Sequence, residues 1–231
     1  AGWWLRSDII WHKPNPMPES VTDRPTKAHE YVFLLTKSAR YFYDADAVRE
    51  EAGANTHSRG NGNGGPKMNT NKPAHVKHFV GLEILSSRNL RSVWTIPTQA
   101  FSEAHFATYP EALVVPCIKA GTSERGCCPE CGAPWERVVE KQDRGFADRT
   151  FRSPHQTDTP GMTNGQGATT LAHVIETRTL GFRPACACDA GDPVPCTVLD
   201  PFMGAGTTGL VAAKLGRRLV ILGHHYQQDD V

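Results

Sequence analysis

Short apolar runs, separated by polar, proline-rich or glycine-rich stretches, divide the chain into a small number of expected elements. Apolar residues at about 7–12 predict a strand that the proline-rich run 14–18 ends. The apolar centre of residues 29–37 predicts the partner strand of a hairpin. A helix is expected to start near Pro110, because proline suits the first turn and Glu111 suits the positive end of the helix dipole.

The pattern around which the chain is organised lies near its end and predicts a strand, a loop and a helix in that order. A short apolar run, Val198 and Leu199, reaches Asp200, and a glycine-rich turn follows. Apolar residues then recur at helical spacing, at Leu210, Val211 and Leu215. The run from residue 217 onward starts as a second strand of the same unit.

The glycine-rich turn has the features of a loop that binds a nucleotide cofactor. Gly204 and Gly206 let the backbone turn sharply and approach a ligand, while Thr207 or Thr208 can cap the helix whose free amides face that ligand. The spacing also fits the dinucleotide fingerprint, in which a pyrophosphate lies on the helix. Here Asp-Pro-Phe-Met intervenes, and the anionic Asp200 suits a cofactor with a cationic amino group and a sulfonium.

Composition sets wide bounds on the fold and adds one local feature. The 231 residues can bury a sizeable core in one or two domains, and 21 glycines with 17 prolines point to long loops. The net charge of +1 says nothing about partners, but residues 52–100 hold six lysines and arginines against one glutamate. Residues 52–77 are almost free of apolar side chains, so they suit contact with DNA phosphates or form a plain linker. The sequence shows no signal peptide and no apolar run approaching roughly 18 residues.

Four of the seven cysteines have spacings that favour a metal ion over disulfides. Cys128 and Cys131 can bind one ion from a single tight turn, in which Gly132 frees backbone amides to reach the sulfurs. Cys186 and Cys188 would supply the second pair, although the gap is longer than in most zinc ribbons and Cys-x-Cys replaces Cys-x-x-Cys. Four thiolates predict a structural, tetrahedral zinc, because no position is left for water.

The remaining cysteines leave one alternative open. Cys127 can replace Cys128 as a ligand, whereas Cys117 and Cys196 are expected to be buried thiols. Metal-type spacings without a disulfide framework indicate a reducing, cytoplasmic setting.

Three segments together resemble one enzyme family. Residues 200–208, Asp-Pro-Phe-Met-Gly-Ala-Gly-Thr-Thr, resemble motif I of the S-adenosylmethionine-dependent DNA amino-methyltransferases. Residues 9–20 and 23–37, with the Tyr-Phe-Tyr-Asp that follows, resemble motif VIII and its flanks in the group with permuted motif order. Residues 105–122 resemble motif X, which precedes motif I in that group, as it does here.

The resemblance implies a Rossmann-like α/β methyltransferase core, incomplete at both ends in these residues. The cysteine spacing adds a zinc-ribbon insertion to it. It implies methyl transfer from S-adenosylmethionine to cytosine N4 or adenine N6 of double-stranded DNA. The residues implied to bind the cofactor are Asp200, Phe202, Gly204, Gly206, Thr207 and Thr208 of motif I, with His105, Ala107, Thr108 and Pro110 of motif X. Trp11, Lys13 and Pro14 would line the pocket for the flipped target base, where an aromatic ring can stack and a cation can contact phosphate.

The expected organisation has five consecutive segments. They are a catalytic-half hairpin at 1–51, a basic loop for target recognition at 52–100, the motif X helix at 101–125, the zinc-ribbon insertion at 126–190 and the cofactor-binding unit at 191–231.

Two features depart from the family pattern. The tetrapeptide Asp/Ser/Asn-Pro-Pro-Tyr/Phe/Trp, which accepts hydrogen bonds from the target amine, does not occur in these residues, so no catalytic residue is assigned. Together with the abrupt start at Ala1, this predicts a fragment whose tetrapeptide lies upstream. Gly223 stands where the family has the acid that binds the ribose, and residues 221–231 also resemble an early segment of quinolinate synthases. Weak cofactor binding and no methyl transfer are therefore expected of these residues alone.

Two other functions stay open. The chain can be an inactive remnant that binds cofactor or DNA, or a methyltransferase acting on a substrate other than DNA. The expected partners are double-stranded DNA and, as a candidate, a cognate restriction enzyme, with no membrane; the sequence leaves the oligomeric state open.

Overall fold

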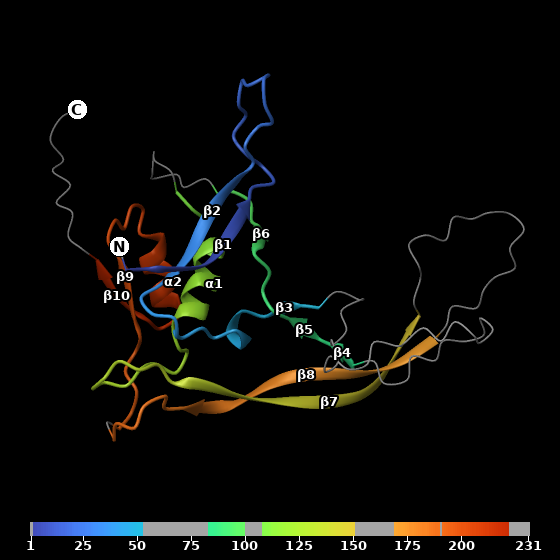
Figure 1. The fold of residues 1–231 in the computed structure, drawn as a ribbon, viewed down its shortest axis with the longest axis vertical. Coiled ribbons are helices and arrows are strands. Elements are labelled where there is room, and N and C mark those ends of the chain that lie inside the picture. The colour runs from blue at the N-terminus through green and yellow to red at the C-terminus, as the bar shows by residue number, and fades with distance from the viewer. Residues whose placement is uncertain (1, 53–82, 100–107, 151–168, 190, 222–231) are drawn as a thin grey trace, which may run out of the picture. The chain divides into compact units, whose positions relative to one another are not determined.

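The structure is a computed structural model that describes residues 2–52, 83–99, 108–150, 169–189 and 191–221 (Figure 1). The chain divides into two compact units. The first unit is formed by Ala1–Val48, Asn89–Val138 and Gly181–Val231, and the second by Arg49–Arg88 and Val139–Leu180. The segments that resemble methyltransferase motifs all belong to the first unit.

A three-stranded sheet of order β2-β1-β6 occupies one side of the first unit. Strand β1 (Trp4–His12) pairs antiparallel with β2 (His29–Thr36), as the hairpin prediction requires, and parallel with β6 (Val93–Thr95). Strand β1 begins before the expected position, because Trp4 and Leu5 continue the pairing with β2 beyond an irregularity in the register.

Helix α1 (Glu111–Gly121) follows Pro110, as predicted, and is buried on two sides. Leu113 packs with β1 and β6 in a cluster that contains both buried tryptophans of these strands. Val114 and Ile118 pack in a second cluster, against helix α2 (Thr207–Lys214). The helix therefore joins the hairpin sheet to the C-terminal part of the unit.

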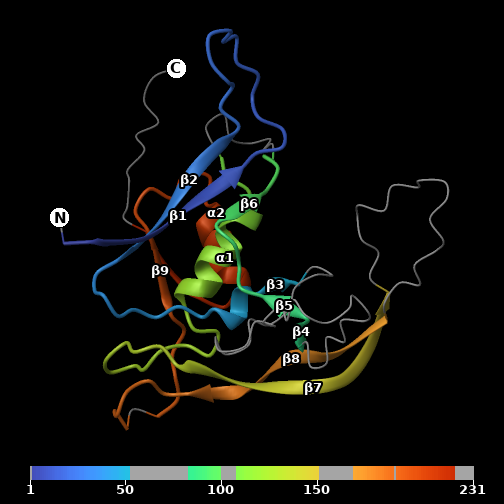
Figure 2. The same cartoon turned by 45° about the vertical axis from the view of Figure 1, so that its right-hand side comes forward.

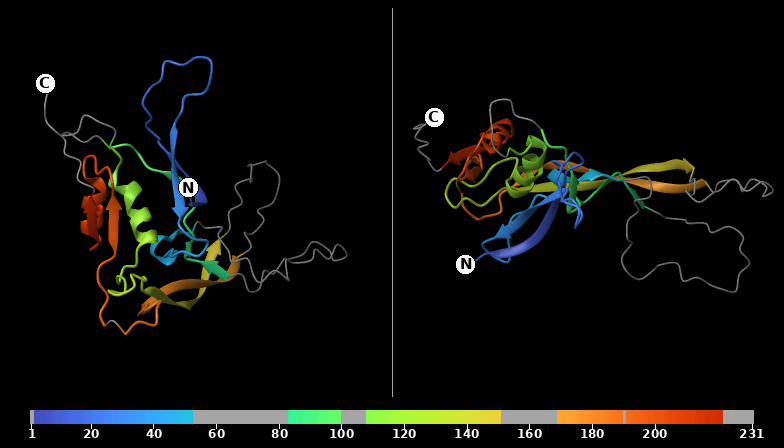
Figure 3. Two further views of the ribbon diagram at one scale, coloured as in Figure 1. Left: turned by 60° about the vertical axis from the view of Figure 1, so that its left-hand side comes forward. Right: turned by 90° about the horizontal axis from the view of Figure 1, so that it is seen from above.

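The C-terminal part of the first unit is the predicted strand, loop and helix, completed by a parallel strand. Strand β9 (Thr197–Asp200) leads through the glycine-rich loop to α2, and β10 (Arg218–Ile221) returns parallel to β9. Figure 3 shows the green helix α1 beside the orange and red strands β9 and β10. A parallel strand pair joined by a helix fits a methyltransferase fold, although the described residues as a whole form small mixed sheets with few helices.

One local prediction about this helix is wrong. Neither Thr207 nor Thr208 caps α2, whose N-cap is Gly206 at a left-handed φ of 80° with no side-chain hydrogen bond. The reason is that both threonines already lie inside the first helical turn, while the Gly206 carbonyl accepts the first helical bond, from the Leu210 amide.

The second unit is built on two long strands that the sequence analysis did not assign. Strands β7 (Glu136–Thr150) and β8 (Thr169–Arg183) run beside each other in opposite directions (Figure 2). The first residues of β7 and the last residues of β8 belong to the first unit. Strand β4 (Glu83–Leu85) extends this sheet parallel to β8, and β3 (Glu50–Glu51) pairs with β5 (Ser87–Arg88). Glu83–Leu85 of the expected basic segment 52–100 thus pairs with the region expected to be a zinc-ribbon insertion, while residues 53–82 lie outside the described residues.

A single helical turn and one negative finding complete the description. The 3-10 helix η1 (Asp46–Val48) lies in contact with α1 and contains one buried residue, Val48. Among the described residues, no helix has the length and apolar character needed to cross a membrane.

We expect Ile118→Ala to lower the free energy of unfolding by about 2–5 kcal/mol, because it empties the cluster shared by α1 and α2. Leu210→Ala is the matched control, since Leu210 is 48% exposed on α2 and its loss should change stability by no more than about 0.5 kcal/mol. Urea denaturation of both variants checks the prediction, and equal shifts in the two would contradict the packing described.

Candidate functional site

The loop between β9 and α2 is organised by the Asp200 carboxylate. Its Oδ1 accepts hydrogen bonds from the backbone amides of Phe202 at 3.1 Å and Met203 at 2.9 Å. Met203, Gly204 and Gly206 all have positive φ, at 52°, 51° and 80°, so the chain turns sharply back toward the helix. The amides of Gly204 and Gly206 donate within this turn, to the carbonyls of Phe202 at 2.6 Å and Met203 at 2.9 Å, so the amides left for a ligand are those at the start of α2.

Asp200 remains charged in this setting. Partial burial raises the pKa of its carboxyl, but hydrogen bonds from the Thr208 hydroxyl and the amides of Met203 and Phe202 outweigh that effect and hold the pKa below its ordinary value. Next to it, Phe202 is 82% exposed and offers an uncovered apolar surface. The loop therefore combines a fixed negative charge, an exposed ring and the free amides at the start of α2.

The segment before α1 lies beside this loop, as the motif X prediction requires. The Tyr109 hydroxyl is 2.7 Å from the Thr208 hydroxyl, and Glu111 forms an ion pair with Lys214 at 2.7 Å. Thr108 and Pro110 flank Tyr109 at the start of α1. The other two motif X candidates, His105 and Ala107, lie outside the described residues.

Tyr109, which the sequence analysis did not single out, makes the contact between the two segments. Its ring packs against both core clusters, and it lines, with Thr208, an apolar cavity of about 480 Å³ that runs along α1. The available signal was an aromatic residue directly before the helix-starting proline, which reads equally well as core packing.

The three residues predicted to bind the target base are differently placed. Trp11 is only 3% exposed, and its indole N–H donates to the Ile96 carbonyl at 2.8 Å, so its ring belongs to the core. Lys13 lies over that ring, 4.5 Å from its centre, and pairs with Glu30. Pro14 is exposed at the end of β1. Their role toward a base stays a prediction.

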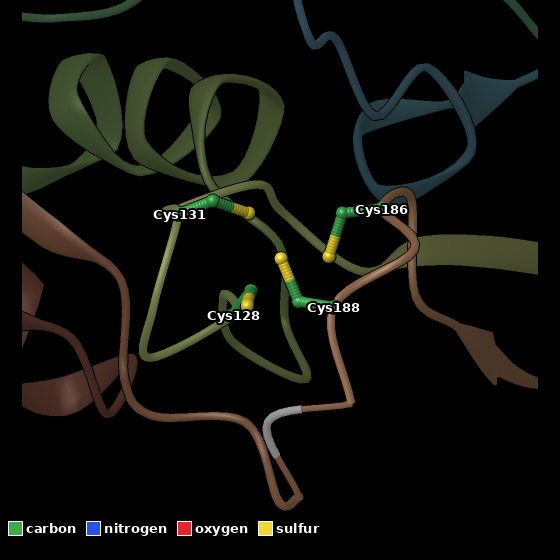
Figure 4. A group of neighbouring side chains, drawn as sticks. All are labelled: Cys128, Cys131, Cys186 and Cys188. Atoms are coloured by element: carbon green, nitrogen blue, oxygen red, sulfur yellow. The ribbon is translucent and has the colours of Figure 1, made fainter.

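The structure brings the four predicted metal ligands into one group. The sulfurs of Cys128, Cys131, Cys186 and Cys188 all lie within 4.8 Å of one another, and Figure 4 shows two chain segments each supplying a pair. The first pair sits in a tight turn in which the Gly132 amide donates to the Cys128 carbonyl at 2.9 Å and Gly132 has a φ of 73°. Tetrahedral thiolates bound at about 2.3 Å are spaced by roughly 4 Å, so the donor set fits a zinc ion.

The proximity of these thiols is visible in their acidity. Hydrogen bonding from the Cys131 backbone lowers the pKa of Cys128 to about 7, whereas the neighbouring side chains of Cys131 and Cys186 raise the pKa of Cys188 to about 12. Only part of the group can ionise without a cation, because adjacent thiolates repel one another.

The structure places Cys128 in the group, while the backbone of Cys127 pairs with Val194. The amide of Cys127 donates to the Val194 carbonyl at 2.8 Å and its carbonyl accepts from Val194 at 2.9 Å, which ties the cysteine turn to the approach to β9. Cys196 is buried, as expected. Cys117 is exposed, so that expectation was wrong; it lies on the side of α1 that lines the open cavity.

Comparison with known proteins settles the family. The model of the DNA methylase family matches residues 1–128. The chain belongs to this family. The resemblance to DNA amino-methyltransferases is thereby confirmed, and the family implies S-adenosylmethionine as the methyl donor.

Three bacterial methyltransferases are similar to this chain. The type II methyltransferase M.Cfr9I of Citrobacter freundii is 46% identical over 121 residues, which cover 52% of this chain and 30% of that protein. M.SmaI of Serratia marcescens is 39% identical over 125 residues, 54% of this chain and 33% of that protein. M.SfiI of Streptomyces fimbriatus is 31% identical over 268 aligned positions, covering 99% of this chain and 62% of that protein. The chain thus spans less than two thirds of the length of these relatives.

We predict that Gly126→Ala disrupts the backbone hydrogen bonds between Cys127 and Val194, which join the cysteine turn to the segment before β9. Gly126 has a φ of 120°, and an added Cβ would lie 2.3 Å from the Val194 carbonyl oxygen, so roughly 2–4 kcal/mol of stability should be lost. Gly132→Ala is the control, because Gly132 also has positive φ but meets nothing within 4 Å, and should cost about 1 kcal/mol. Thermal unfolding distinguishes the two, and a smaller loss at Gly126 than at Gly132 would refute the tie.

Proposed function

We propose that the chain is part of an enzyme that transfers a methyl group from S-adenosylmethionine to an exocyclic amino group of duplex DNA, at cytosine N4 or adenine N6. The observation that carries the proposal is the juxtaposition of motif I and motif X, in which Tyr109 meets Thr208 beside the Asp200 carboxylate. Both segments must touch one cofactor in a methyltransferase, and here they touch each other.

The proposed cofactor residues divide the ligand between them. The Asp200 carboxylate suits the cationic amino and sulfonium groups, while exposed Phe202 offers its ring to the apolar parts. The remaining contacts are proposed for the residues around the turn and the start of α1, namely Gly204, Gly206, Thr207, Thr208, Thr108 and Pro110. His105 and Ala107 stay predictions from the motif alone.

The chemical step needs a group that these residues do not include. An exocyclic amine is a weak nucleophile, because its lone pair is delocalised into the ring, and the family's tetrapeptide accepts its hydrogen bonds. That tetrapeptide does not occur within residues 1–231. We assign no catalytic residue and propose Trp11, Lys13 and Pro14 only for the neighbourhood of the flipped base.

We also propose that Cys128, Cys131, Cys186 and Cys188 hold one structural zinc ion, in a zinc-ribbon insertion between motif X and motif I. All seven cysteines are free thiols, which suits a reducing, cytoplasmic setting. Double-stranded DNA is the proposed partner, and a restriction enzyme that cuts the same site is a further one.

The cofactor proposal predicts that the 231-residue chain binds S-adenosylmethionine and that Asp200→Asn weakens binding about tenfold, since a hydrogen bond to a charged group is lost. Asp192→Asn is the matched control, because that carboxylate is 98% exposed. Isothermal titration calorimetry measures both. Equal affinities of the two variants would show that Asp200 does not contact the cofactor. If the parent chain does not bind S-adenosylmethionine, the proposed function is wrong.

Two further measurements separate the alternatives. Duplex DNA binding that weakens steeply with salt favours a DNA substrate over a small molecule or protein. Tritiated methyl incorporation into unmethylated duplex DNA is not expected from residues 1–231 alone, and incorporation above a heat-treated control would show that another residue replaces the tetrapeptide.

The zinc proposal predicts about one equivalent of zinc in protein purified under reducing conditions. Cys131→Ser and Cys188→Ser should each lose the metal, whereas Cys117→Ser, on α1 outside the group, should retain it. Atomic absorption provides the measurement. Full zinc occupancy in Cys188→Ser, or none in the parent chain, would contradict the four-cysteine site.

A further inference from the structure

We propose that the loop between β1 and β2 carries an apolar wedge, residues 14–18 with Met17 at the tip, which enters the base stack of duplex DNA at the place that an extruded base has left. The inference rests on the proposed function, because it takes duplex DNA as the partner. It adds to that function a residue, Met17, and a surface through which the chain contacts the stacked bases.

The tip of this loop is apolar, exposed and restricted in conformation. Met17 is 84% exposed, more than any other large apolar side chain that the structure describes. Prolines stand at positions 14, 16 and 18. Proline fixes its own φ near about −65° and also restricts the residue before it to extended conformations. Because Asn15 and Met17 each precede a proline, the segment holds the methionine outward with little conformational freedom.

The strands beneath the loop stop pairing where prolines follow them. Strands β1 and β6 pair in parallel up to His12 and Thr95, and the Ile96 amide donates to the His12 carbonyl at 3.1 Å. Pro14 and Pro97 follow on the two chains, and neither has an amide hydrogen with which to continue the ladder. Without another support, the chain beyond this point would be free to move.

The Asn15 side chain takes the place of the missing backbone pairing. Its Oδ1 accepts a hydrogen bond from the Thr98 amide at 3.0 Å, and its Nδ2 donates to the Thr98 carbonyl at 3.4 Å. On the hairpin side, the Lys13 amide donates to the Ala28 carbonyl at 2.9 Å. The chain is therefore held on both sides just before Met17, so Asn15 is a positioning residue for the wedge.

The wedge lies at the edge of the first unit that also carries the cofactor loop. Trp11, near the end of β1, belongs to a core cluster against which Tyr109 packs, and the Tyr109 hydroxyl lies 2.7 Å from that of Thr208. The ends of β1 and β9 therefore meet at one edge. Figure 2 shows the blue loop projecting beyond the ends of β1 and β2. A base that reaches the cofactor must leave its duplex at this edge, where the loop tip projects.

An apolar wedge suits the gap that base extrusion leaves. Extrusion removes a base from between two neighbours whose faces were stacked on it. Proteins that unstack DNA insert Met, Leu, Ile, Phe or Pro side chains at such steps. A methionine is unbranched and fills irregular gaps. Phosphate binding does not account for the tip, because Met17 and the flanking prolines carry no charge and no side-chain donor.

The experiment measures binding of the full 231-residue chain to two duplexes of one sequence, one intact and one with a single abasic site, by fluorescence anisotropy. An abasic site is a preformed gap, which the wedge can enter without displacing a base. We expect the parent chain to bind the abasic duplex about tenfold more tightly, the effect of burying most of a methionine side chain. Met17→Ala should reduce this preference to within about twofold, whereas Met17→Leu should keep it.

Two further variants test the support of the wedge and supply the control. Asn15→Ala keeps Met17 but removes both hydrogen bonds to Thr98, so the preference should fall to about threefold, because the loop must then be ordered on binding. Leu35→Ala is the matched control, since Leu35 is 48% exposed at the far end of the same hairpin, and it should leave the preference unchanged. General loosening of the fold would weaken binding to both duplexes and leave their ratio as it was.

The other outcomes are distinguishable. If the parent binds both duplexes equally, or if Met17→Ala keeps the preference, the wedge is wrong while DNA remains the partner. If the parent binds neither duplex, the proposed DNA partner is wrong, and the wedge with it. If Met17→Ala instead converts a dimer into a monomer in analytical ultracentrifugation and leaves the DNA preference unchanged, the tip binds a second copy of the chain and the inference is overturned.

Discussion

The burial of helix α1 on two sides is the constraint on which the first unit depends. Leu113 packs toward the tryptophans of the hairpin sheet, while Val114 and Ile118 pack toward α2. Two small sheets of three and two strands could not bury enough apolar surface separately, since short ribbons are marginally stable in water. The helix therefore joins the β1–β2 hairpin and the β9–α2 loop in one unit. Tyr109, which lies just before the helix, contacts Thr208 at the start of α2.

The cofactor loop and the cysteine group are connected through the same short run of chain. After Cys188 the backbone passes Val194, which bridges to Cys127, then buried Cys196, and then enters β9. At its far end β9 delivers Asp200, so the strand is anchored on one side by the cysteine turn and on the other by the loop it supports. A metal ion that orders the cysteines would also fix where β9 begins. A structural zinc would thus help to position Asp200, although it would not contact that residue.

Sequence predicted those elements whose signals are local. The hairpin, the helix after Pro110 and the strand, loop and helix around Asp200 follow from apolar runs, a helix-starting proline and paired glycines. Three features needed the tertiary structure. Gly206 caps α2 because the loop enters it left-handed; Tyr109 meets Thr208 only after two helices pack; and β7 and β8 are polar strands whose pairing supplies the order that their composition does not.

The convergence of Cys131 with Cys186 has a consequence for the length of the insertion. The proposed metal ion would close the base of the segment that contains β7 and β8, where Glu136 and Arg183 also form an ion pair at 2.9 Å. Once a loop is closed at its base, its length costs little, since each doubling adds only about 0.6 kcal/mol of closure entropy. The length of the segment that joins β7 to β8 would then matter little to where β9 begins.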